Sequence, residues 1–208
     1  MNWTEVAGFV TGALCVWLVV RRNIWNFPVG IANNVFFIVL FVQAGLYADA
    51  GLQVVYIGLG LLGWYWWTRG GERRSALPIS RTPVAAMAGV AVGIAVGTAL
   101  IWWLLTSHTD SVVPGWDALT TSMSLGAQVM LNRKWIGNWV VWIAVDVIYV
   151  VLYAVKDLWL TSALYAGFII LCVMGLRQWR VEAARTAEPY PIAEPAALAD
   201  NTAPAAVR

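Results

Sequence analysis

Long apolar segments follow one another along most of the chain, separated by short polar turns. Seven of these segments approach the length of about 20 residues that a helix needs to cross a bilayer. They cover residues 6–20, 29–44, 51–68, 84–105, 116–131, 138–155 and 159–177. Several fall short of that length, which favours helices that lie inside a bundle. The pattern therefore predicts an all-α, polytopic membrane protein with seven transmembrane helices.

The segment 23–67 is repeated by the segment 135–179, at a fixed offset of 112 residues and without a gap. Identical residues at this offset include Asn26 and Asn138, Ile31 and Ile143, Leu40 and Leu152, Gly63 and Gly175, and Trp67 and Trp179. A repeat of this length in so apolar a chain indicates two copies of one membrane unit, and such proteins commonly carry a solute between the copies.

The repeat predicts a 3+1+3 arrangement of helices within one transporter domain, residues 1–180. Repeat one covers about 6–68, repeat two covers about 116–180, and a linker helix at about 84–105, rich in Gly, Ala and Val, joins them. Because three helices and one linker make an even number of crossings, the repeats are parallel and related by an axis along the membrane normal. Residues 181–208 contain few large apolar groups, so we expect a disordered cytoplasmic tail.

The composition excludes an ordinary soluble domain. Hydrophobic residues make up 61% of the chain and charged residues 12%, with a mean hydropathy of +0.70, so the apolar side chains cannot all be hidden in one soluble core. Trp and Tyr side chains favour the bilayer interface, but several of the 14 Trp residues lie well inside apolar segments. These inner tryptophans are candidates for contact with a ligand.

Basic residues in the predicted loops fall on one side of the membrane. They are Arg21, Arg22, Arg69, Arg73, Arg74, Arg81, Arg133, Lys134, Arg177 and Arg180. The opposite loops carry Asp49, Asp117 and Asp157, with Lys156 as a basic exception. Because cytoplasmic loops are enriched in Lys and Arg, we expect an outer N-terminus and a cytoplasmic C-terminus in the cell inner membrane. The net charge of +2 is small and indicates no nucleic-acid partner.

Polar side chains inside the predicted helices are costly in hydrocarbon, so they point to function or to tight pairing. One face of the segment 138–155 carries five candidate substrate-binding residues: Asn138, Trp139, Trp142, Asp146 and Tyr149. The residues at the same positions of repeat one are Asn26, Phe27, Gly30, Asn34 and Phe37, which are less bulky and carry no charge. This asymmetry suits a site shaped for one aromatic, polar molecule.

Further candidates lie on the other predicted helices: Asn33, Asn34, Gln53, Tyr56 and Gln128. Two alternatives stay open. The amides can instead bridge helices as structural contacts, and Asp146 alone could relay an ion or a proton in coupled transport.

The sequence lacks the features of several other classes. It has no phosphate-binding Gly-x-x-x-x-Gly-Lys loop, and His108 is its one histidine. Ser122 and Ser124 have no histidine to activate them as nucleophiles, so we expect no enzyme. Cys15 and Cys172 lie inside apolar segments, and we expect no disulfide, no metal site and no cofactor.

Four motifs together resemble the PnuC family of vitamin-precursor transporters, over nearly all of residues 8–180. They are Asn23-Ile-Trp-Asn-Phe-Pro-Val-Gly-Ile-Ala-Asn33, Gln43-Ala-Gly-Leu-Tyr-Ala-Asp49, Gly63-Trp-Tyr-Trp-Trp67 and, most specific of all, Asn138-Trp-Val-Val-Trp142. The resemblance implies a homotrimer, nicotinamide riboside as the substrate, and facilitated diffusion without ion coupling, made one-way by a cytoplasmic kinase.

The resemblance also implies roles for the candidates. Trp139 and Trp142 would form aromatic walls or a gate, Asn138 and Gln128 would donate and accept hydrogen bonds, and Gln53 and Tyr56 would contribute from the other half. Similar proteins of the family carry thiamine or riboflavin, so thiamine uptake remains an alternative. A membrane receptor without transport activity and a sugar facilitator with a parallel repeat are alternatives of other classes.

Overall fold

The computed structural model describes residues 3–43, 47–108, 113–155 and 157–187. These residues form seven α-helices and one short 3-10 helix, and they contain no strand beyond one isolated bridge. The helices are α1 (Trp3–Val20), α2 (Asn26–Gln43), α3 (Tyr47–Arg69), η1 (Glu72–Arg74), α4 (Val84–His108), α5 (Pro114–Asn132), α6 (Asn138–Val155) and α7 (Trp159–Ala187). The predicted all-α class and the seven helices are confirmed.

Within the described residues, four helices are long and apolar enough to span a bilayer: α2, α4, α6 and the part of α7 from Trp159 to Arg185. The apolar part of α1, Val10–Val20, is shorter. Helices α3 and α5 carry more polar residues, such as Tyr56 and Gln128, and some of these face the interior of the bundle. Part of their lower hydropathy therefore comes from residues that line the interior of the bundle.

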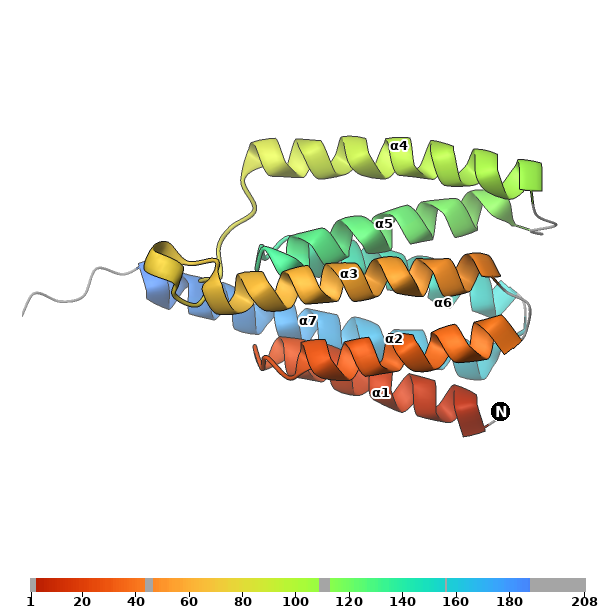
Figure 1. The fold of residues 1–208 in the computed structure, drawn as a ribbon, viewed down its shortest axis with the longest axis horizontal. Coiled ribbons are helices and arrows are strands. Elements are labelled where there is room, and N and C mark those ends of the chain that lie inside the picture. The colour runs from red at the N-terminus through yellow and green to blue at the C-terminus, as the bar shows by residue number, and fades with distance from the viewer. Residues whose placement is uncertain (1–2, 44–46, 109–112, 156, 188–208) are drawn as a thin grey trace, which may run out of the picture.

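Six helices form a closed ring. Helix α1 packs on α2, α2 on α3, α3 on α5, α5 on α6, α6 on α7, and α7 returns to α1. The repeats contact each other twice, through α3 with α5 and through α7 with α1. Because α3 corresponds to α7 and α5 to α1 at the offset of 112 residues, these two contacts are equivalent. Helix α4 packs on α5 outside the ring, and α1 and α5 run in the same direction (Figure 1). The ring thus consists of two like-oriented triplets joined at two equivalent seams.

The turn between α1 and α2 has the same geometry as the turn between α5 and α6. Arg22 and Lys134, which correspond at the offset, have left-handed backbone angles φ of 57° and 51°. The side-chain amide of Asn26 donates to the backbone carbonyl three residues earlier at 2.7 Å, and that of Asn138 does the same at 2.6 Å. The sequence repeat is therefore a repeat of local structure as well.

The segment between η1 and α4 crosses the end of the bundle and is fixed to the second turn. The backbone of Ser80 donates to the carbonyl of Lys134 at 3.2 Å and accepts from the N–H of Ile136 at 3.0 Å. The hydroxyl of Thr82 accepts from the N–H of Gly137 at 3.0 Å. This clamp places α4 beside α5, at the periphery.

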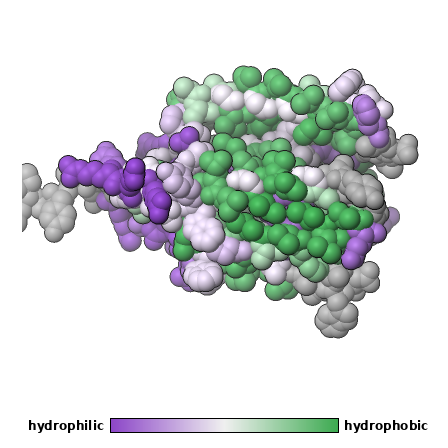
Figure 2. Space-filling model, in the orientation of Figure 1, coloured by the Kyte–Doolittle hydropathy of each residue, from purple (hydrophilic) through white to green (hydrophobic). Residues whose placement is uncertain are grey.

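Helices α1, α3, α5 and α7 all finish at one end of the bundle, here called the basic end, and Figure 2 shows hydrophilic residues gathered there. The predicted basic side of the membrane corresponds to this end, and the middle of the bundle is apolar. Lys156 lies outside the described residues. Helix α7 continues to Ala187, past the expected domain boundary at residue 180, and the rest of the expected tail, 188–208, lies outside the described residues as well.

Candidate functional site

A cavity of about 350 Å³ lies inside the six-helix ring. All six helices of the ring contribute side chains to its wall, and α4 contributes none among the described residues. Its volume falls in the range of sites for small organic molecules, which is roughly 300–1,000 Å³. The cavity is therefore the candidate functional site.

The stripe on α6 forms one wall of the cavity. Trp139, Trp142, Asp146 and Tyr149 all line it, as their spacing of three or four residues along one helix face predicts. Trp139 and Asp146 are buried, and Trp142 and Tyr149 are half-buried. The helix period therefore identified this wall from the sequence.

Four other expected residues also line the cavity, namely Asn33, Asn34, Tyr56 and Gln128. Two of these amides are held by other side chains. The side-chain oxygen of Asn33 accepts a hydrogen bond from the Thr11 hydroxyl at 2.7 Å, and the side-chain amide of Gln128 donates to the side-chain oxygen of Asn132 at 3.1 Å. Asn33 therefore bridges α1 and α2 while it faces the cavity, so for this residue the two interpretations offered from the sequence are compatible, whereas the bond of Gln128 lies within α5.

Two expected residues do not line the cavity. Gln53 is half-buried on α3 but is absent from the wall. Asn138 is fully buried, and its amide is engaged with the carbonyl of Trp135 in the turn before α6. Its oxygen makes no hydrogen bond with the described residues. The structure therefore gives Asn138 a role in the turn, and it does not bring Gln53 to the site.

Several lining residues were missed from the sequence. They include Cys15, Asn26, Phe27, Gly30, Tyr165, Phe168 and Cys172. The repeat itself contained a signal for two of them, because Tyr165 and Phe168 correspond to Gln53 and Tyr56 at the offset of 112 residues. The two cysteines looked like ordinary apolar residues, and in the structure both are free thiols beside the cavity.

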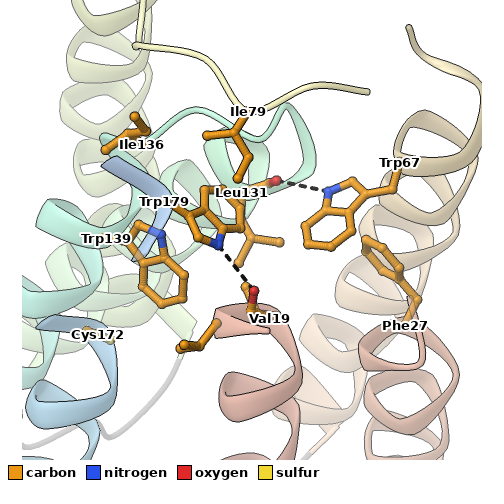
Figure 3. Close-up of a cluster of buried hydrophobic side chains, with 10 residues drawn as sticks. Val19, Phe27, Trp67, Ile79, Leu131, Ile136, Trp139, Cys172 and Trp179 are labelled. Carbon is orange, nitrogen blue, oxygen red and sulfur yellow. Dashed lines mark hydrogen bonds between the residues drawn. The ribbon is translucent and has the colours of Figure 1, made fainter. Parts of the chain in front are cut away.

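A cluster of buried side chains closes the ring at the basic end of the cavity (Figure 3). At its centre the rings of Trp67 and Trp179 lie 6.0 Å apart, and these two residues, here called the tryptophan pair, correspond at the offset of 112 residues. Phe27 meets Trp67 edge-on at 5.1 Å and 90°, and Trp139 meets Trp179 edge-on at 5.3 Å and 88°. Phe27 and Trp139 also correspond at the offset of 112 residues, so the aromatic contacts at the meeting point of the two repeats are symmetric.

The tryptophan pair also bonds each repeat to the other. The indole N–H of Trp67 donates to the carbonyl of Leu131 at 3.2 Å, and that of Trp179 donates to the carbonyl of Val19 at 3.3 Å (Figure 3). Val19 and Leu131 themselves correspond at the offset of 112 residues. Both bonds therefore cross the seams of the ring, and they form a matched pair.

Lys134 lies above this cluster, in the turn between α5 and α6. It is 9% exposed, its ammonium donates to the carbonyl of Leu77 at 2.7 Å, and it lies 4.5 Å from the centre of the Trp67 ring. Burial, together with the nearby charge of Arg22, lowers the pKa of Lys134 to about 8. A cation in contact with an indole face gains about 0.5–2 kcal/mol, so the contact with Trp67 offsets part of the cost of burying the charged ammonium.

Aromatic rings also stack at the other end of the cavity, in the second half of α6 and the first turns of α7. Tyr165 lies 4.8 Å from Tyr149 and 5.4 Å from Tyr153, measured between ring centres. Repeat one has a related stack, with Phe37 and Phe41 at 5.6 Å. The cavity therefore has aromatic groups at both ends and amides in its middle.

The cavity offers several kinds of contact to a small molecule. Its wall offers indole and phenol rings, amides, two thiols and one carboxylate among the described residues. No group of three His, Cys, Asp or Glu side chains suited to a metal ion occurs in the described part of the chain. Aromatic faces with convergent polar groups are typical of sites for small molecules.

Comparison with known proteins assigns the chain to a family. A model of the family described as Nicotinamide mononucleotide transporter matches residues 2–181. The chain belongs to this family. It is accordingly a membrane transport protein and not an enzyme, as the sequence led us to expect, and the resemblance to PnuC proteins is confirmed.

Relatives with different named substrates share about the same sequence identity with the chain. The nicotinamide riboside transporter PnuC of Escherichia coli is 26% identical, over 86% of this chain and 85% of its own length. The riboflavin/roseoflavin transporter RibM of Streptomyces davaonensis is also 26% identical, over 90% of this chain and 89% of its own. The nicotinamide riboside transporter PnuC of Neisseria mucosa is 28% identical, over 74% of this chain and 60% of its own.

A solved structure has the same fold. The crystal structure of the vitamin B3 transporter PnuC superposes with a TM-score of 0.67, covers 88% of this chain and 83% of its own, and is 24% identical in sequence. This similarity supports the arrangement of helices described above.

Proposed function

We propose that the chain is a facilitator that takes up nicotinamide riboside across the cytoplasmic membrane. The observation that carries the proposal is the cavity inside the ring, lined by indole and amide side chains, in a chain whose relatives include named nicotinamide riboside transporters. Its proposed substrate contacts are the eight expected residues that line it: Asn33, Asn34, Tyr56, Gln128, Trp139, Trp142, Asp146 and Tyr149. Gln53 and Asn138 are withdrawn from that set.

The chemistry of the wall suits this molecule. Nicotinamide riboside joins a flat pyridinium ring to a ribose, and a cation on an aromatic face gains about 0.5–2 kcal/mol. Trp142 is half-buried in the wall and offers such a face, and its counterpart in repeat one is Gly30, which leaves room opposite a large ring. The amides of Asn34 and Gln128 can bond the ribose hydroxyls and the carboxamide.

Transport would follow from movement at the two seams of the ring. If the triplets rock against each other, the seams α1–α7 and α3–α5 open and close, and the cavity is exposed to each side in turn. The basic end would face the cytoplasm, which puts the N-terminus outside. We further propose facilitated diffusion without ion coupling, net uptake driven by a cytoplasmic kinase, and assembly as a homotrimer.

Riboflavin is a second candidate substrate, because the relative named a riboflavin/roseoflavin transporter is as similar to this chain as the nicotinamide riboside transporter of Escherichia coli. Thiamine, which is also an aromatic cation, is a third. A receptor of the same fold would bind such a molecule without moving it.

Uptake by liposomes that contain the purified chain tests the proposal. We expect labelled nicotinamide riboside to enter until its concentration is equal on both sides, with no response to a sodium or proton gradient, and to enter further when a kinase and ATP are enclosed. Uptake of riboflavin or thiamine but not of nicotinamide riboside would contradict the proposed substrate. Binding without any uptake would identify a receptor.

A further inference from the structure

The wall of the cavity carries one formal charge among the described residues, the carboxylate of Asp146. This side chain is 6% exposed and lies near the middle of α6. The cavity wall contains no Lys or Arg from the described part of the chain to balance it. A carboxylate so placed in a membrane protein is costly unless a partner compensates its charge.

The protein partner of Asp146 is a weak one. The thiol of Cys172 donates to its Oδ2 atom at a distance of 3.6 Å, and a thiol is a poor hydrogen-bond donor. No ion pair that involves Asp146 occurs among the described residues. The charge is therefore directed at a space that a ligand can enter.

The repeat shows that the charge is not needed for the fold. The position of Asp146 in repeat one is occupied by Asn34, which also lines the cavity and is neutral. Elsewhere the two copies match closely, in their turns and in the tryptophan pair. A carboxylate in one copy and an amide in the other gives the cavity one negative side, as recognition of a single cation requires.

The neighbours of Asp146 add a preference for a flat ring. Trp142 lies one helical turn before it and Tyr149 one turn after it, and both line the cavity. A planar cation in this space would meet an aromatic face and the carboxylate together, and each interaction favours positive charge.

We infer that Asp146 is the residue that makes this cavity select aromatic molecules with one positive charge over neutral ones of the same shape. The inference rests on the proposed function, which it deepens. It also decides between the named substrates of the two equally similar relatives, because the pyridinium of nicotinamide riboside is cationic and the flavin ring of riboflavin is neutral.

The test compares two molecules that differ in charge and little in shape. Nicotinamide riboside is a cation, and its 1,4-dihydro form is neutral. Competition for the site in purified protein, and uptake into liposomes, give the ratio of cation to neutral molecule. Because both are measured on the same preparation, a loss of folded protein cancels in this ratio.

We expect the wild-type protein to prefer the cation at least tenfold, and Asp146→Asn to lower that ratio at least tenfold. Asp146→Glu should keep the preference, and the double variant Asp146→Asn with Asn34→Asp should restore part of it, because the charge returns to the equivalent position. The control is Asp49→Asn, which removes an exposed carboxylate from α3 that does not line the cavity. It should leave the ratio unchanged.

An unchanged ratio in an active Asp146→Asn variant would overturn the inference while leaving the proposed function intact. If the wild-type protein neither binds nor moves nicotinamide riboside, the proposed function fails, and thiamine and riboflavin then test the inference as cation and neutral probe. Binding of riboflavin in preference to thiamine, unaltered by Asp146→Asn, would overturn it.

Discussion

Replacing Trp179 by Phe removes one of the two indole donors that join the repeats at the basic end. The ring is fully buried, and its N–H donates to the carbonyl of Val19 at 3.3 Å. That carbonyl also accepts the backbone N–H of Arg22 at 2.9 Å, so it keeps one partner in the variant. The lost bond therefore costs about 1 kcal/mol, the low end of the range for a buried group, and the smaller ring adds a packing cost of similar size.

In the proposed mechanism these costs fall on the state that is closed at the basic end, because the bond crosses a seam that would separate when that end opens. A cost of about 1 to 2 kcal/mol changes the ratio of closed to open molecules by a factor of about 5 to 30. The lower figure applies if the packing loss is the same in both states. We therefore expect Trp179→Phe to open the basic end more often by at least about fivefold.

Cys172 reports this opening without an engineered probe, because it is buried and lines the cavity. The measurement is the rate at which a membrane-impermeant maleimide labels it, in a Cys15→Ala background, from each side of sealed vesicles. Trp64→Phe makes the same substitution at an exposed position of α3 and serves as the control. Labelling of Trp179→Phe at the rate of this control, or faster labelling from the non-basic side alone, would refute the reasoning.

Three further predictions use other parts of the structure. Trp142→Ala should weaken binding of nicotinamide riboside at least tenfold in an equilibrium assay, whereas Val151→Ala, which changes an exposed position on the same helix, should have little effect. Gly175→Ala should lower the thermal midpoint in detergent by several degrees, since its new methyl group would lie 2.5 Å from an indole ring, whereas Gly167→Ala on the same helix meets nothing within 4 Å and should not lower it. Burial lowers the pKa of Lys134 from 10.5 to about 8, so the charged ammonium lowers the free energy of unfolding in full below pH 8, and this penalty fades as the pH rises towards 10.5. The melting temperature of the protein should therefore rise between about pH 8 and 10, and Lys134→Met should remove that rise.

The period of a helix identifies a face, but it does not say how far a cavity extends along that face. The α6 stripe was predicted because Trp139, Trp142, Asp146 and Tyr149 share a face that the cavity follows. The same reasoning on α3 included Gln53, which does not line the cavity in this structure, because the cavity wall on α3 begins at Tyr56. Depth depends on the sizes of side chains from several helices, and no one segment contains that information.

Competition from nearby backbone groups explains why Asn138 was predicted at the site but does not line the cavity. Asn138 shares the face of the α6 stripe, yet it lies at the first turn of the helix, where its amide bonds the preceding turn. An Asn at the start of a helix has backbone groups within reach, and these compete with any ligand. The sequence also could not predict which helices of the two repeats lie side by side. The repeat predicts the orientation of the triplets, but not that α3 packs on α5 and α1 on α7.

The repeat is kept in one part of the molecule and lost in another, and the two parts have different physical tasks. The tryptophan pair and its carbonyl partners correspond at the offset of 112 residues, so both seams close with the same bonds at nearly the same lengths, 3.2 and 3.3 Å. If the two triplets rock about a common axis, as proposed, they need equal seams, because a stronger bond on one side would hold that side closed while the other opened. For the proposed substrate the cavity needs the opposite, since nicotinamide riboside has a ring at one end and a sugar at the other and no two-fold symmetry. Trp142 opposite Gly30, and Asp146 opposite Asn34, supply that inequality without disturbing the seams, because all four residues line the cavity and none takes part in the two cross-repeat bonds of the cluster.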